Sequence, residues 1–238
     1  FVLFPRVQGP LWGMPTDALR ATSGLSDTMS PGTLAELTLS EAVAFRAVFK
    51  SRLPPFNRMY WRGPVLWDFD GRVWSAPPAV RSEPRYDATN TPVDYTVTVE
   101  AHGKSWLFAL DLPGKLPPRA VATSDLQILA LRPVTSRQRY DMVSFLDYTY
   151  GTQEPPEVLE RALRLPPAFN PRARAYAQEL RSRFPRDRDL VQELLRRFNQ
   201  DGYVYTLSPP LLGEHTVDDF MFGAKTGFCE HYASAFAF

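Results

Sequence analysis

The segment from Gly223 to Phe236, GAKTGFCEHYASAF, contains the only cysteine of the 238-residue chain, Cys229. After Gly227 four apolar residues are spaced as on one face of an α-helix. The members of this repeat are Tyr232, Ala233, Phe236 and Ala237. The pattern predicts a helix that begins at or near Cys229 and buries this apolar stripe. Such a helix would organise the C-terminal part of the fold and present a single thiol at its N-terminal end.

The predicted position of Cys229 suits a nucleophile. Unpaired amides and the dipole at a helix N-terminus favour the thiolate form of a cysteine. The same amides can stabilise the oxyanion of an acyl-transfer intermediate. Gly227 has no side chain, which leaves the backbone open to a substrate. The alternative is that Cys229 is a small buried side chain with a packing role alone.

Two helices are predicted before this segment. Asn170-Pro171 is typical of an N-cap followed by proline at the first helical position, and it predicts a helix through RARAYAQELRSRF. Asp187 is predicted to cap a second helix, and Gly202 is expected to follow its end. The apolar stripe of the second helix is predicted to pack in a core. It consists of Leu190, Val191, Leu194, Leu195 and Phe198.

The chain from about residue 41 to 150 carries strand signals. Tyr95, Val97 and Val99 alternate with threonines. A second alternating set consists of Trp106, Phe108, Leu110 and Leu112. The pair Asp70-Gly71 stands between apolar runs and predicts a hairpin. Short strands at this spacing favour an antiparallel β-sandwich.

The predicted fold class is therefore α+β. Residues 1–150 are predicted to form the β-rich domain, with a loop arm over residues 1–40. The proline-rich residues 151–169 are predicted to form a linker, and residues 170–238 a helical domain.

Composition excludes several classes of protein. The net charge is +1 and no basic stripe is visible, which argues against nucleic-acid binding. A single cysteine excludes an intrachain disulfide. No run reaches the roughly 18 apolar residues of a membrane-spanning helix. The chain starts without Met and ends in the apolar HYASAFAF, so we expect it to be a piece of a longer protein.

The motif around the cysteine resembles a known family. Residues 216–236, TVDDFMFGAKTGFCEHYASAF, are similar to the nucleophile segment of the transglutaminase-like superfamily. The stretches FPRVQGPLWGMP (4–15) and RMYWRGPVLWDFDGRVW (58–74) resemble the extracytoplasmic part of bacterial TgpA-type membrane proteins. The resemblance extends over nearly the whole chain.

The resemblance implies a fold, a location and a reaction. It makes residues 170–238 the helical first half of a transglutaminase-like (papain-like) core, and Cys229 the acyl-accepting nucleophile. The family's His and Asp come later than Phe238, so no base is assigned within residues 1–238. It implies the periplasmic face of the bacterial inner membrane, with transmembrane helices outside this chain. Substrates would be proteins or peptides with Gln and amine donors, and no cofactor is implied.

Other polar residues near the motif receive structural predictions. His231 follows Cys229 by about 200° around a helix, so it is predicted to face solvent or to support the site without pairing with the thiol. A metal site formed by Cys229, Glu230 and His231 is disfavoured for the same reason. His215 is predicted to be a surface loop residue, with approach to the site as the alternative. Asp218 and Asp219 are predicted to cap the segment that leads to the cysteine.

Three functions are compatible with the sequence. The first is a transglutaminase-like acyltransferase that joins Gln to an amine such as Lys. The second is a cysteine peptidase or amidase on the same fold, with water as the acceptor. The third is a non-catalytic binding or assembly module of the envelope. Residues 1–238 alone are expected to be inactive, because the base of the triad is missing.

Overall fold

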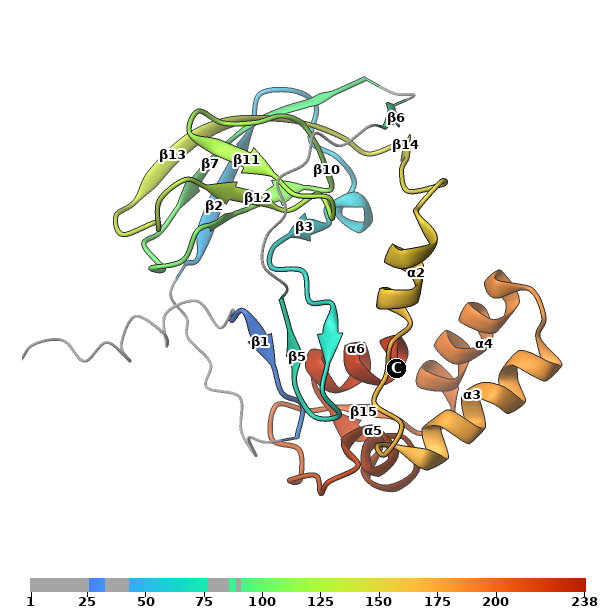
Figure 1. Cartoon of the computed structure of the whole chain (residues 1–238). Coiled ribbons are helices and arrows are strands. Elements are labelled where there is room, and N and C mark those ends of the chain that lie inside the picture. The colour runs from blue at the N-terminus through green and yellow to red at the C-terminus, as the bar shows by residue number, and fades with distance from the viewer. Residues whose placement is uncertain (1–25, 33–42, 77–85, 89–90) are drawn as a thin grey trace, which may run out of the picture.

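The computed structural model describes residues 26–32, 43–76, 86–88 and 91–238. The predicted loop arm of residues 1–40 lies mostly outside them. The fold is α+β, as predicted, with a body of strands above a body of helices (Figure 1). Its described part contains five α-helices, α2 to α6, and none is long and apolar enough to cross a membrane.

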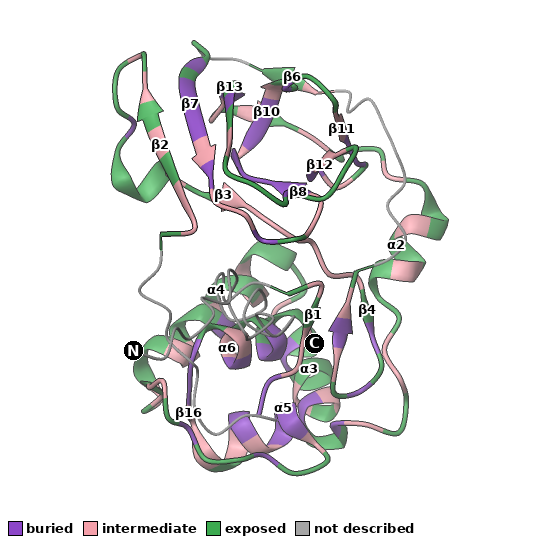
Figure 2. Cartoon of the chain, turned by 90° about the vertical axis from the view of Figure 1, so that its left-hand side faces the viewer, coloured by how far each residue is buried: buried purple, intermediate pink, exposed green. Residues whose placement is uncertain are grey.

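A four-stranded antiparallel sheet forms the first layer of the upper body. Its strands lie in the order β10 (Leu112–Lys115), β13 (Gln138–Phe145), β7 (Val93–Val99) and β2 (Phe45–Phe49). The alternating residues Tyr95, Val97 and Val99 are 0% exposed, as their spacing predicts. β7 is accordingly a mostly buried strand in Figure 2.

A second antiparallel sheet shares a hydrophobic core with the first. It consists of β11 (Ala120–Ala122), β12 (Ile128–Ala130) and β8 (Trp106–Leu107). Two short pairs flank these sheets, β3 (Trp61–Arg62) with β9 (Ala109–Leu110) and β6 (Asp87–Ala88) with β14 (Tyr148–Thr149). A single 3₁₀ turn, η1 (Phe56–Arg58), precedes β3. The predicted antiparallel sandwich is confirmed.

The segment from Trp106 to Leu112 departs from the predicted alternation. Every residue from Trp106 to Leu110 is buried, because the chain passes from one sheet to the other through the core. Asp111 then turns the chain with a φ of 48°. Period-two patterns assume one solvent-exposed face, which a crossing segment does not have.

The predicted hairpin at Asp70-Gly71 is present, with Gly71 at a φ of 114°. It joins β4 (Asp68–Phe69) to β5 (Trp74–Ser75), and β1 (Thr28–Met29) pairs with β5. The hairpin packs against the helical body. The indole of Trp74 donates a 2.8 Å hydrogen bond to Ser234 Oγ, and Phe69 meets the ring of Phe238 edge-on.

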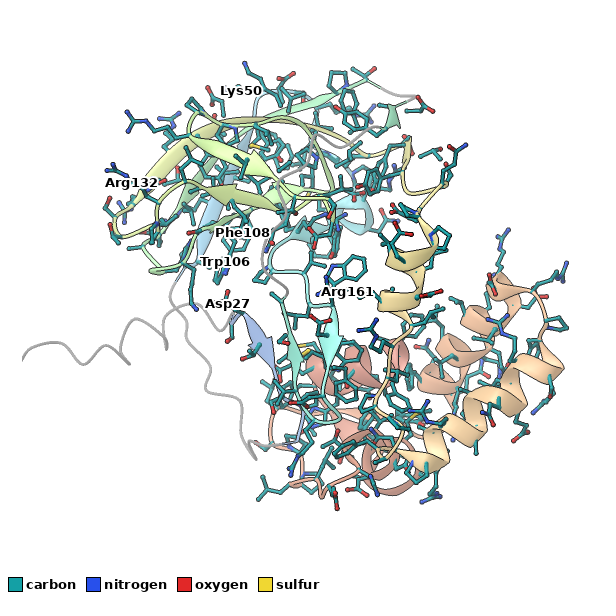
Figure 3. All side chains as sticks on the ribbon, in the orientation of Figure 1. Asp27, Lys50, Trp106, Phe108, Arg132 and Arg161 are labelled. Atoms are coloured by element: carbon teal, nitrogen blue, oxygen red, sulfur yellow. The ribbon has the colours of Figure 1, made fainter. Side chains whose placement is uncertain are left out.

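The predicted linker contains a helix, α2 (Pro156–Ala162), which the sequence analysis missed. Pro156 occupies its first position, where proline's fixed φ suits a helix start. Arg161 on α2, labelled in Figure 3, pairs with Asp68 of the hairpin at 2.7 Å. The connection is therefore partly helical and tied to the hairpin.

The two predicted helices are α3 (Pro171–Arg183) and α4 (Asp187–Gln200). Gly202 follows α4 with a φ of 78°, as expected for a helix stop. Asp187 does not cap α4; it is the first helical residue and pairs with Arg181 at 2.7 Å. The predicted core stripe of α4 is only partly buried, since Leu194 is buried while Val191 and Leu195 are 39% and 46% exposed.

Candidate functional site

Cys229 is the first residue of α6 (Cys229–Ala237), as its sequence context predicts. Phe228 before it is extended, with φ −115° and ψ −172°. The preceding strand β16 (Thr226–Gly227) pairs in parallel with β15 (Val204–Tyr205). This pairing fixes the direction from which the chain enters α6. The thiol is exposed.

The buried face of α6 differs from the predicted one. The residues that α6 buries are His231, Ser234 and Ala235. Ala233 and Ala237 of the predicted stripe are exposed, and Phe236 is 39% exposed. The reason is that the hairpin and α5 (Thr216–Asp219) pack on the other side of α6, where Ser234 meets Trp74.

His231 is 1% exposed, so of its two predicted roles the one facing solvent is wrong, and the supporting role is left. Its ring lies edge-on to Phe228, with centroids 4.6 Å apart, and tilted against Phe220. Gly227 leaves room for this ring, because a Cβ there would lie 2.7 Å from His231 Cγ. The glycine of the motif is therefore required by the histidine packed against it.

His231 also forms a hydrogen bond at the start of α6. Its Nδ1 accepts a 3.4 Å hydrogen bond from the amide of Phe228. Burial lowers the pKa of His231, which favours the neutral ring with its proton on Nε2. Among the described residues Nε2 has no hydrogen-bond partner. His231 is thus an anchor of the helix start.

The remaining polar groups at the helix start are few. The amides of His231 and Tyr232 point to the carbonyl of Phe228 at 3.0 and 3.4 Å. The amides of Cys229 and Glu230 precede them in the first turn, where a helix provides no internal acceptor. An oxyanion formed beside the thiol would lie near these donors. Burial raises the pKa of Glu230.

A pocket of about 580 Å³ opens beside the thiol. Its walls come from α4, the β15 region and α6, and they are largely aromatic. The lining residues are Leu195, Phe198, Asn199, Tyr203, Tyr205, Cys229, Tyr232, Ala233 and Phe236. The exposed stripes of α4 and α6 therefore face a common space next to Cys229. Sequence analysis missed Tyr203 and Tyr205, whose signal was the short extended YVYTL.

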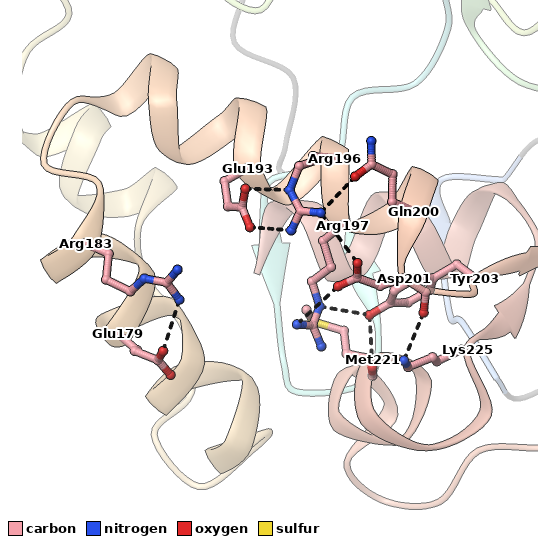
Figure 4. Close-up of polar contacts among 10 residues, drawn as sticks. All are labelled: Glu179, Arg183, Glu193, Arg196, Arg197, Gln200, Asp201, Tyr203, Met221 and Lys225. Atoms are coloured by element: carbon pink, nitrogen blue, oxygen red, sulfur yellow. Dashed lines mark hydrogen bonds and ion pairs between the residues drawn. The ribbon is translucent and has the colours of Figure 1, made fainter.

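Tyr203, which lines the pocket, is held by a polar network (Figure 4). Its hydroxyl donates a 2.9 Å hydrogen bond to the carbonyl of Met221 and accepts one from Arg197. Lys225 donates to the carbonyl of Asp201 at 3.0 Å. Met221 and Lys225 lie in and after the π-helical turn η2 (Phe220–Ala224). The network joins the end of α4 to the turn before Cys229 and so fixes the pocket wall.

The side chains of Asp218 and Asn170 both cap helices. Asp218, in α5, caps α3, and Asn170, at the start of α3, caps α5. The carboxylate of Asp218 accepts the amides of Arg172 and Ala173 at the start of α3, at 2.9 and 2.7 Å. The side chain of Asn170 accepts the amide of Val217 in α5 at 3.0 Å. Asn170 is the N-cap residue of α3 and Pro171 is its first helical residue, as predicted, but the Asn170 side chain forms no capping hydrogen bond to α3. The prediction that Asp218 caps its own segment is wrong. Asp219 accepts the amide of Gly213.

His215 also serves a structural contact. Its Nδ1 accepts a 3.2 Å hydrogen bond from the amide of Asn170. No hydrogen bond joins the Cys229 thiol to an imidazole or a carboxylate in the described part of the chain. Within that part there is also no group of three or more His, Cys, Asp or Glu side chains arranged to hold a metal ion.

The fold joins an antiparallel sandwich to a helical body, and an exposed cysteine is the first residue of α6. These features are the basis for comparing the chain with known families. The profile of the TgpA N-terminal domain family matches residues 1–150, and the chain belongs to this family. It is 39% identical over 240 residues to the protein-glutamine gamma-glutamyltransferase of Pseudomonas aeruginosa. The alignment covers 100% of this chain and 36% of that relative, so the chain spans about a third of the relative's length.

The chain is also similar to solved structures. It superposes on the crystal structure of the periplasmic domain of TgpA from Pseudomonas aeruginosa with a TM-score of 0.86 and 38% identity, over 91% of this chain and 76% of that one. The same domain bound to ethylmercury matches with a TM-score of 0.84 and 38% identity, over 90% of this chain and 77% of that one. The fold and the family predicted from the motifs are confirmed.

Proposed function

We propose that the protein containing this chain is a transglutaminase-like acyltransferase with Cys229 as its nucleophile. The observation that carries the proposal is the placement of an exposed thiol at the first position of α6, open to an aromatic pocket. The identity to a protein-glutamine gamma-glutamyltransferase supports the reaction class. The likeness to a periplasmic domain supports action at the periplasmic face of the inner membrane.

The reaction has two steps. The Cys229 thiolate attacks the carboxamide carbon of a Gln side chain, and the carbon–nitrogen bond breaks to release ammonia and leave a thioester. A primary amine such as that of Lys then attacks the thioester, and the thiol leaves. The proton that the thiol loses goes to a base and from it to the leaving nitrogen; the resemblance expects this base to be a His beyond Phe238.

The pocket favours an amine over water as the acceptor. Its walls carry Tyr203, Tyr205 and Tyr232 and exposed apolar side chains beside the thiol. An alkylamine buries its methylene groups against such walls, with a gain of about 0.8 kcal/mol for each CH₂. Water gains nothing there. Hydrolysis of the same thioester is the reaction of the peptidase or amidase alternative.

The proposal is tested by replacing Cys229 in the full-length protein. We expect Cys229→Ala to abolish incorporation of a fluorescent amine into a Gln peptide, and deamidation of that Gln to a Glu residue to be the minor reaction of the unchanged protein. Leu53→Ala, an exposed leucine remote in sequence from the thiol and outside the pocket beside Cys229, serves as the matched control and should retain activity. Unchanged incorporation by Cys229→Ala would contradict the assignment. Conversion of the peptide Gln to Glu as the dominant reaction, even with the amine present, would identify a hydrolase.

The isolated chain of residues 1–238 should behave differently. No described imidazole lies within hydrogen-bond distance of the thiol, so we expect no turnover from this piece. Multiple turnovers by the purified piece, lost in its Cys229→Ala variant, would show that a base lies within it. If neither the full-length protein nor this piece shows turnover, and the thiol is unreactive in both, the protein is the non-catalytic binding module.

A further inference from the structure

A second pocket, of about 1000 Å³, lies on the sandwich between the two sheets. One wall is the first half of β13, and the other is formed by the loop from β10 to β11 and by the end of β12. Nothing in the proposed reaction at Cys229 uses this pocket. Its walls combine three features that together specify a ligand.

The first feature is an unpaired strand edge. β13 pairs with β7 along residues 138–144, but on its other side β10 pairs only with residues 143–145. Residues 138–142 therefore have no strand partner on that side within the described part of the chain. Alternate residues of an antiparallel strand point their N–H and C=O groups to the same side. The pocket thus presents backbone donors and acceptors along one wall.

The second feature is charge. Lys115, Arg119, Arg132 and Arg139 are exposed and line the pocket, and none forms an ion pair with a described carboxylate. Asp141 is the acidic residue among the lining side chains, and it is paired with Lys50 at 2.7 Å. Figure 3 shows Arg132 pointing outward from the sandwich. Lys115, Arg119 and Arg132 therefore place positive charge without an ion-pair partner on the wall opposite β13. Arg139 lies on β13 itself, where it attracts the charge of Asp141.

The third feature is apolar surface. Leu116 and Leu131 line the same pocket and are 37% and 53% exposed. Charges and prolines alone are a common way to keep a strand edge from pairing. Exposed leucines in a hollow beside the edge do the opposite, because they gain from being covered.

We propose that this pocket binds an extended acidic peptide segment, which adds as a strand to the free edge of β13. The backbone of the segment would pair with residues 138–142, and its carboxylates would meet the basic side chains around the pocket. Every second side chain of a strand points to one face, so alternating apolar residues would cover Leu116 and Leu131. This mode recognises a pattern of charge and hydrophobicity on a flexible partner and involves no chemistry at Cys229.

The test uses the full-length protein and a labelled peptide of alternating Glu and Val, with an alternating Lys and Val peptide as the charge control. We expect the acidic peptide to bind by fluorescence anisotropy and the basic one not to bind. The double variant Arg119→Glu/Arg132→Glu should bind about tenfold more weakly, because it reverses two exposed charges that would meet the carboxylates of the peptide. Arg52→Glu, an exposed arginine of the same domain outside the pocket, is the matched control and should bind as the unchanged protein does.

Backbone pairing is tested separately. The same acidic peptide with N-methyl groups on alternate residues keeps its charge and loses its amide donors, and we expect it to bind poorly. Equal binding of the methylated peptide, or equal loss in Arg52→Glu, would overturn the proposal. So would binding to anionic phosphatidylglycerol vesicles without binding to the peptide, because the basic patch would then recognise a lipid surface.

Discussion

The core of the sandwich and the smaller core around α6 are covered in different ways. Along β7 three alternating side chains, Tyr95, Val97 and Val99, are completely buried between the two sheets. On α6 the apolar residues Ala233 and Phe236 are exposed, while His231 and Ser234 are buried. The strand buries its most apolar face, and the helix buries a face that includes polar groups.

This difference teaches which contacts determine burial. A central strand has neighbours on both edges, so its inward face is set by its own period. The helix has one face against the hairpin and α5, where Ser234 finds a partner in Trp74, and another toward the pocket beside Cys229. Its apolar stripe lines that pocket. Exposed apolar surface next to a thiol is what a binding site requires.

The largest expected effect separates a core leucine from a pocket leucine. Leu110 is 0% exposed and Leu195 is 46% exposed. In the chain of residues 1–238 we expect Leu110→Ala to lower the free energy of unfolding by about 2–5 kcal/mol, because it leaves a cavity. Leu195→Ala should change it by less than about 0.5 kcal/mol. Urea unfolding measures both, and equal losses would mean that the α4 stripe is packed like the sandwich core.

Local sequence signals predicted the elements of the molecule better than the faces they bury. The glycine at position 71, the repeat along β7 and the start of α6 at Cys229 depend on short-range preferences, and they are confirmed. The burial of His231 and the exposure of Leu195 depend on segments distant in sequence. No period in the sequence shows that Trp74 would meet Ser234, 160 residues away.

The caps of α3 and α5 show the same limit. Asn170 and Asp218 are typical capping residues, and both do cap. Their helices are exchanged because the two helix starts lie side by side in the fold. The type of residue was predictable, and its partner was not. Cys229 differs, because its thiol needs only the start of its own helix; its role as nucleophile remains a prediction.

The second prediction tests the contact between Gly227 and His231. A methyl group at position 227 would lie 2.7 Å from the imidazole, so we expect Gly227→Ala to cost about 1–3 kcal/mol. Gly223→Ala is the matched control, because its added methyl group meets nothing within 4 Å. Denaturant unfolding of both variants gives the comparison.

The same contact predicts non-additivity. Adding His231→Ala to Gly227→Ala removes the clashing ring, so the double variant should lose less than the sum of the two single losses. If Gly227→Ala is as harmless as Gly223→Ala, His231 moves freely and does not anchor the helix start. In that case the packing of His231 would not be the reason for a glycine before the cysteine.

The smallest expected effect compares the two buried histidines, one in each body of the molecule. His102 stacks on Trp106 with ring centroids 4.3 Å apart, and its Nδ1 accepts the amide of Lys104. Burial lowers the pKa of both His102 and His231, but at His102 a hydrogen bond with the backbone of Trp106 and the negative charge of Asp27 oppose the lowering. At His231 no such interaction opposes the lowering of the pKa. We therefore expect His231 to lower the free energy of unfolding at acidic pH more than His102 does.

The sign follows from proton binding. A histidine in the unfolded chain has a pKa of about 6.5. Below that pH the unfolded state binds more protons than the folded state, so stability falls as the pH falls, by at most about 1.4 kcal/mol per pH unit for one proton. We expect His231→Gln to reduce the loss of stability between about pH 7.5 and pH 5.5, and His102→Gln to reduce it less. Urea unfolding at the two pH values measures this difference. A larger reduction in His102→Gln would show that the sandwich, and not the start of α6, holds the histidine that resists protonation more strongly.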